Sequence, residues 1–101
     1  MDMTNRRYEL IENEGGHAAE STVMQFDASS EPFRATYSGP NVVYGHVIVG
    51  NGSMLYHAMD KQGNLTAGRA SVEVSAENMT LTWQWLTGDQ SGGISKWRQL
   101  T

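Results

Sequence analysis

Apolar and polar residues alternate along most of this 101-residue chain, in short runs separated by turn signals. No run keeps apolar residues at a 3.6-residue period over three turns, so the pattern favours strands over helices. The connections between the runs are short enough to join antiparallel neighbours. The predicted strands are residues 6–13, 18–26, 32–38, 42–50, 53–60, 65–75, 78–87 and 94–100.

Eight antiparallel strands leave two unpaired edges unless the sheet closes on itself. Closure removes those edges, and eight strands enclose a space that side chains fill or that holds one small ligand. We therefore predict an all-β, eight-stranded antiparallel up-and-down barrel. A chain of this length has room for one core, so the barrel is predicted to be a single domain over residues 1–101.

The Asn51-Gly52 pair fixes the register of one hairpin. Asn-Gly is the preferred sequence of a two-residue type I′ turn, which sets Gly50 opposite Ser53. One face of this hairpin is apolar with two small residues and is predicted to point inward, whereas the other face carries two histidines. The inward pairs are Val49–Met54, Val47–Tyr56 and Gly45–Ala58, and the outward pairs are Ile48–Leu55, His46–His57 and Tyr44–Met59.

A second hairpin turns at Ala76-Glu77 and places Trp83 and Trp85 on one face, because residues two apart on a strand point to the same side. Ala70 and Gly68 are their predicted partners, so large rings meet small residues. The opposite face is mostly polar, which is typical of a sheet with one buried side. The predicted interior is Met24, Phe26, Phe33, Tyr37, Met54, Tyr56, Trp83, Trp85 and Trp97.

Charge and composition narrow the function classes. The net charge is −4 and the charges are scattered, which disfavours a nucleic-acid partner. Without cysteine the chain has neither disulfides nor thiolate chemistry. No signal segment and no apolar run of membrane-spanning length is recognisable, so we expect a cytoplasmic protein with no membrane partner.

Several motifs follow one another in an order that resembles a family of short bacterial proteins. They are YSGP at residues 37–40, GHVI at 45–48, LYHAMDKQGNLTAG at 55–68 and WQWLTGDQSGG at 83–93, with Pro40 in place of the family's second glycine. The resemblance covers residues 6–97 and implies an all-β barrel of lipocalin or streptavidin-like character.

Members of that family are often labelled N-acetylglutamate synthase. This chain has no glycine-rich strand-to-helix turn that could hold a pyrophosphate, so the label implies no acetyl transfer here. No serine has a histidine in a predictable hydrogen-bonding position, and no two carboxylates share an inward face. We therefore expect a protein that is not an enzyme and that uses no cofactor.

The aromatic interior has two interpretations. In the first, a small hydrophobic or aromatic ligand stacks on the rings inside the barrel. In the second, the rings fill a solid barrel and the protein acts as a structural or interaction module. The candidate ligand-binding residues are Tyr37, Tyr56, Trp83, Trp85 and Trp97, with Arg34, Gln84 or Asp89 at the rim.

The outward faces raise two further hypotheses. His46 and His57 lie opposite each other, but a zinc or copper site needs a third ligand from His17 or a carboxylate, so we predict half-exposed histidines and no metal. An apolar outer stripe of the kind that marks contact sites predicts a homodimer. Its residues are Tyr44, Ile48, Leu55 and Met59.

Overall fold

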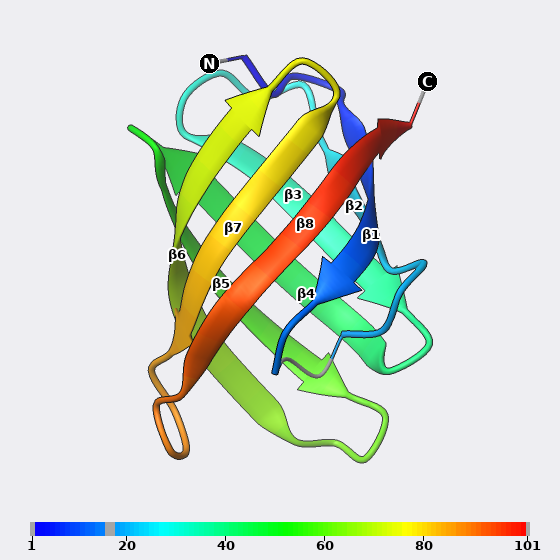
Figure 1. Ribbon diagram of the computed structural model, residues 1–101, viewed down its shortest axis with the longest axis vertical. Helices are drawn as coiled ribbons and strands as arrows, with labels where there is room; N and C mark the ends of the chain where they lie inside the picture. Colours follow the sequence, from blue (N-terminus) through cyan, green and yellow to red (C-terminus); the bar gives the residue numbers. More distant parts are fainter. Residues whose placement is uncertain (1, 16–17, 101) are drawn as a thin grey trace.

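Eight antiparallel strands form a closed barrel in the computed structural model, which describes residues 2–15 and 18–100 (Figure 1). Each strand pairs with the next and the last pairs with the first, which confirms the up-and-down topology. The described residues include no helix long and apolar enough to cross a membrane. The strands are β1 (Arg7–Asn13), β2 (Val23–Phe26), β3 (Phe33–Gly39), β4 (Val42–Gly50), β5 (Ser53–Asp60), β6 (Leu65–Ser75), β7 (Asn78–Trp85) and β8 (Gly92–Leu100).

The bounds of β4, β5 and β6 are those predicted, β1 and β3 begin one residue later than predicted, and β2, β7 and β8 differ by more. The prediction of a strand from residue 18 is wrong, because the chain turns before Val23. In that turn the Thr22 hydroxyl donates to the Ala19 carbonyl oxygen at 2.6 Å. β7 ends two residues earlier than predicted and β8 begins two residues earlier, since Gly92 and Gly93 already pair with β7.

Both predicted hairpin registers are confirmed. Met54 lies opposite Val49, and Trp83 lies opposite Ala70. Asn51 and Gly52 have φ of 54° and 75°, the left-handed backbone that a type I′ turn requires at both central positions. The inward faces of the hairpins therefore point to the barrel interior as the residue pattern indicates.

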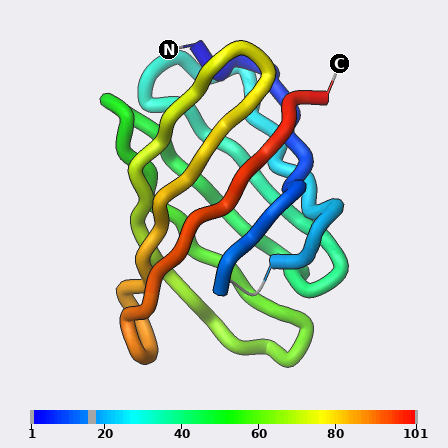
Figure 2. Tube along the Cα trace, in the orientation of Figure 1, coloured from blue at the N-terminus to red at the C-terminus, as the bar shows by residue number. Residues whose placement is uncertain are grey.

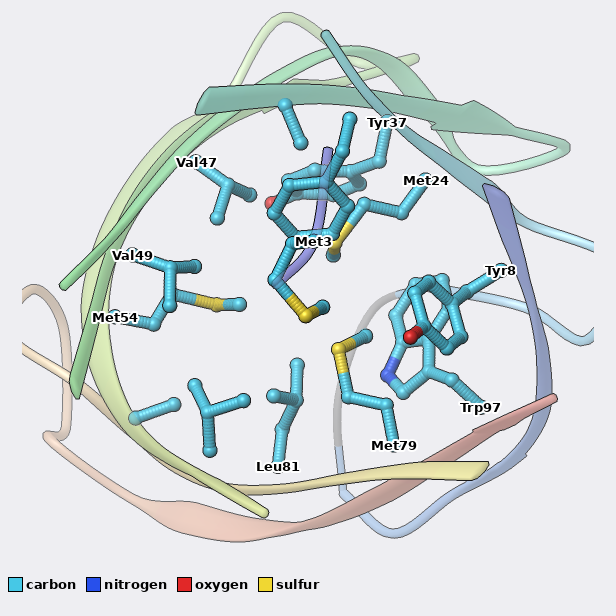
Figure 3. Close-up of a cluster of buried hydrophobic side chains, with 14 of the residues drawn as sticks. Met3, Tyr8, Met24, Tyr37, Val47, Val49, Met54, Met79, Leu81 and Trp97 are labelled. Atoms are coloured by element: carbon cyan, nitrogen blue, oxygen red, sulfur yellow. The ribbon is translucent and has the colours of Figure 1, made fainter. Parts of the chain in front are cut away.

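The N-terminal segment closes one end of the barrel. Met3 is wholly buried and lies in the middle of the ring of inward side chains (Figure 3). The backbone N–H of Asn5 donates to the Asp27 carbonyl oxygen at 3.0 Å and anchors the segment next to the end of β2. Both chain termini lie at this end (Figure 2). The sequence pattern did not reveal Met3 because it precedes the first strand.

Candidate functional site

A cavity of about 60 Å³ lies inside the barrel and opens toward the end opposite Met3, where β1, β3, β5 and β7 finish. That volume is room for a few water molecules. The wall is mostly apolar and strongly aromatic. It is formed by Leu10, Asn13, Ala18, Met24, Tyr37, Val47, Met54, Tyr56, Leu81, Trp83, Trp85, Ser95 and Trp97.

Three aromatic rings of this wall each lie across a glycine that is their direct partner on the next strand. A side chain at any of these glycines would collide with the ring; at Gly93 its first carbon would lie 2.9 Å from Cζ2 of Trp83. Glycine is therefore required here for the close approach of ring to backbone. The pairs are Tyr37–Gly45, Tyr56–Gly68 and Trp83–Gly93.

Trp83 and Trp85 form a continuous indole surface along β7. Their ring centroids are 5.5 Å apart and the planes are tilted by 40°, a favourable separation for two aromatic rings. Trp83 is buried, whereas Trp85 is half-buried toward the open end. The pair therefore provides one apolar wall that runs from the interior to the mouth of the cavity.

Two polar side chains of the wall are already engaged. The Asn13 amide nitrogen donates to the Ala18 carbonyl oxygen at 2.9 Å. Trp97 Nε1 donates to the Ser95 hydroxyl oxygen at 2.9 Å, in the buried interior. These bonds hold Asn13 against Ala18 and fix the Trp97 indole at the cavity surface.

The cavity wall also contains two tyrosines, Tyr37 and Tyr56. The Tyr56 hydroxyl is fully enclosed and has no hydrogen-bond partner. Burial raises the pKa of Tyr56 to about 12, and burial together with the nearby Tyr56 raises the pKa of Tyr37 further. Both hydroxyls are thus protonated at neutral pH. Among the described residues that line the cavity, none carries a charge.

A protein-family model described as avidin-like protein matches residues 1–100. The chain belongs to the avidin-like family. Comparison with curated proteins and with solved structures gave no match. Membership fits the closed eight-stranded barrel, and it confirms the streptavidin-like fold that the motifs implied. At this coarse level the avidin-like family consists of binding proteins and not enzymes.

In this avidin-like barrel, all five predicted aromatic residues line the cavity, but the predicted rim residues do not. Arg34 is exposed on the outer face and lies 3.9 Å from the Asp27 carboxylate. Gln84 is also exposed and accepts a hydrogen bond from Arg69. These two side chains point outward because they alternate with inward neighbours on β3 and β7.

Asp89 lies in the turn after β7, outside the cavity wall. Its carboxylate accepts a hydrogen bond from the Ser91 backbone N–H at 2.9 Å, and this bond lowers the pKa of the Asp89 carboxyl. The side chain therefore stabilises its own turn, as is usual for aspartate in such a loop.

The residue pattern does not predict that Asn13 lines the cavity. Strict alternation along β1 from Tyr8 and Leu10 would turn Asn13 outward. The register of β1 against β8 shifts between Leu10 and Glu12, and this irregularity sets Asn13 opposite the buried Ser95. A bulge of this kind re-aims a side chain and has no clear signal in the residue pattern.

His46 and His57 face each other across β4 and β5 as predicted. Their rings are stacked, with centroids 5.3 Å apart and planes within 3°, and the Tyr44 ring packs on His46 at 4.3 Å. His17, the proposed third ligand, lies outside the described residues. Within the described part of the chain, no group of three or more potential metal ligands occurs.

Proposed function

We propose that this avidin-like protein binds one small, largely hydrophobic or aromatic molecule inside the barrel. The observation that carries the proposal is the cavity itself, which opens at one end and is walled by five aromatic side chains. Such a site, mostly apolar with few polar groups, is typical of small-molecule pockets. Membership of a family of binding proteins supports the same conclusion.

The energetics favour a compact ligand. Each 100 Å² of ligand surface removed from water is worth about 2.5 kcal/mol, and the indole surface of Trp83 and Trp85 adds stacking. The other end of the barrel is filled by Met3, so the ligand enters past the half-buried Trp85. A cavity of about 60 Å³ is smaller than one aromatic ring, so a ring-shaped ligand requires the half-buried Trp85 side chain to move aside, and any longer tail would project through the open end.

Isothermal titration calorimetry against a panel of small molecules tests the proposal. The panel contains biotin, as the natural probe of an avidin-like barrel, together with indole, 1-indanone and indane. Trp85→Leu removes the stacking surface at the mouth and should weaken any binding about tenfold. Leu86→Ala, at a half-exposed position beside it that does not line the cavity, is the matched control. Absence of saturable heat with every compound would reject the proposal.

The outer surface supports a second candidate function, self-association. Leu55 and Leu65 are 57% and 76% exposed on β5 and β6, and Tyr44 and Ile48 on β4 are also exposed. The chain has no Asp, Glu, Lys or Arg between residues 42 and 59. An apolar patch of this kind, which has the exposed Arg69 beside Leu55, is typical of a protein contact site, and a second copy of this chain is its simplest partner.

A further inference from the structure

His46 and His57 form a pair of imidazoles on the outer wall of the barrel, away from the cavity. They are direct partners across β4 and β5, and they point outward because Val47 and Ala58 beside them are buried. Their rings are parallel to within 3°, with centroids 5.3 Å apart. His57 is exposed and His46 is half-buried. The barrel therefore presents two imidazoles side by side to the solvent.

The ring nitrogens of this pair are not used by the protein. The two imidazoles contact each other and the Tyr44 ring, which packs on His46 with centroids 4.3 Å apart. Among the described residues, neither imidazole takes part in a hydrogen bond or an ion pair, and no nitrogen of the half-buried His46 is sealed from solvent. The nitrogens are therefore open to a ligand that arrives from outside.

The surroundings of the pair accept a cation and leave room for a large partner. The cross-strand neighbours are Thr36 on β3 and Ala67 on β6, which are small and uncharged. The chain carries no Asp, Glu, Lys or Arg between residues 42 and 59, which includes both histidines. A bound metal ion would therefore meet no basic residue of these two strands.

Two arginines lie in the next row of outward residues, and both are engaged by other groups. Arg34 is 3.9 Å from the Asp27 carboxylate, and Arg69 donates a hydrogen bond to the Gln84 side chain at 3.1 Å. Their charged ends are thus directed to partners other than the histidines.

Two imidazoles are half of a zinc site. Zinc binds imidazole nitrogen at about 2.0–2.1 Å and takes four ligands in a tetrahedron when its role is structural. The described residues contain no group of three or more potential metal ligands, so one copy of the chain does not complete the site. In a two-fold dimer the same patch of both copies meets itself. A second copy then supplies the two nitrogens that are missing.

We infer that His46 and His57 of two copies together hold one divalent transition-metal ion of the zinc type between two barrels. This inference rests on the proposed self-association through the outer face and is independent of the interior binding site. Two nitrogens on a tetrahedral zinc ion lie about 3.3 Å apart, so the rings must lean toward each other. The exposed His57 is free to make this adjustment.

Analytical ultracentrifugation of the full chain in EDTA and in zinc chloride tests the shared site. Zinc binds the dimer and not the monomer, so it should lower the dissociation constant of the dimer at least about tenfold. Calorimetric titration should saturate at one zinc ion for two chains. Magnesium prefers oxygen ligands and should have no effect.

The possible failures are distinguishable. A dimer with the same dissociation constant in EDTA and in zinc would overturn the metal site and leave self-association standing. A chain that stays monomeric in both conditions would reject both. Saturation at one zinc ion for each chain would also overturn a site shared between two copies.

Two variants assign the response to the histidine pair. His46→Ala and His57→Ala should each abolish the effect of zinc on the dissociation constant, with an unchanged circular dichroism spectrum because both side chains point outward. Thr36→Ala, at the exposed position beside His46 on β3, is the matched control and should respond to zinc as the wild type does.

Cobalt(II) in place of zinc gives a spectroscopic readout, since a tetrahedral cobalt site absorbs visible light far more strongly than the hydrated ion. The wild type should show this absorption and His57→Ala should not. A zinc response or a cobalt spectrum that survives in both histidine variants would place the metal elsewhere and overturn the inference.

Discussion

Trp83 on β7 lies directly opposite Gly93 on β8, and its indole covers the place where a side chain of residue 93 would begin. The carbonyl oxygen of Glu14 crowds the same place from the other side. Backbone and ring therefore meet at the mouth of the cavity with no room for a Cβ. The same relationship recurs for the two cavity tyrosines, so glycines shape this end of the barrel.

Replacement of Gly93 should be costly. Gly93→Ala forces either the Trp83 ring or the Glu14 backbone to shift, and overpacking of this kind costs about 1–3 kcal/mol. For a domain of this size that corresponds to a fall in Tm of roughly 4–8 °C per kcal/mol. Thermal unfolding followed by circular dichroism measures it.

Gly50→Ala is the matched control, because the nearest atom to a side chain there is Pro32 Cβ at 3.8 Å, an ordinary contact. Its Tm should stay within about 2 °C of the wild type, as for a neutral surface change. Equal losses in the two variants would show that close packing on Trp83 is not the cause.

Truncation of Trp83 should destabilise the barrel strongly. Its side chain is 7% exposed, and removal of a buried large ring costs about 3–5 kcal/mol. Leu86→Ala, at a position that is 50% exposed, should cost about 0.5 kcal/mol or less. Urea unfolding of both variants separates the two cases, and a loss below about 1 kcal/mol for Trp83→Ala would place the indole outside the core.

High pH should weaken the fold through the cavity tyrosines. Burial raises the pKa of Tyr56 from 10.0 to about 12, so the folded state holds the phenolic proton more tightly than the unfolded state. That contribution is fully present below pH 10 and is lost as the pH rises toward 12. Tyr37 acts in the same direction.

The urea midpoint at pH 8, 10 and 11 tests this pH dependence. The urea concentration at the midpoint should decrease for the wild type when the pH is raised from 10 to 11. The decrease should be smaller for Tyr56→Phe. The decrease of the midpoint that remains in Tyr56→Phe measures the contribution of Tyr37 deprotonation. Parallel curves for the two proteins would contradict the assignment of the effect to Tyr56.

Self-association should depend on the outer face of β4, β5 and β6. Leu55→Glu places a charge at an exposed position between Ile48 and Arg69 and should lower the apparent mass in size-exclusion chromatography. Ile94→Glu introduces the same charge at a 42% exposed position on β8 and should leave the mass unchanged. A wild type that elutes as a monomer at every concentration would exclude this second function.

The barrel could be predicted from the sequence because its strands are short, alternating and joined by informative turns. Asn51-Gly52 alone specified a register that holds from Gly50–Ser53 to Tyr44–Met59. The tryptophan spacing specified the inward face of β7 in the same way. In both hairpins, local turn chemistry and burial of one face point to the same pairing.

The cavity could be predicted only in part. Its aromatic residues followed from alternation, whereas Asn13 reaches the wall through a bulge and Met3 closes the far end from outside any strand. The predicted rim residues lie outside the cavity wall for a related reason, since Arg34 alternates outward and Asp89 is engaged by its own turn. The alternation of residues along a strand predicts which side chains point into the barrel. It does not predict where loops, bulges or terminal segments place theirs.

Chemical-shift mapping with 1-indanone tests the central claim most directly, because it locates even weak binding. The indole N–H signals of Trp83 and Trp85 and the amides around Tyr56 should shift together and saturate, while residues of the outer face around Leu55 stay unchanged. Shifts confined to the outer face, or none at saturating ligand, would contradict an interior binding site.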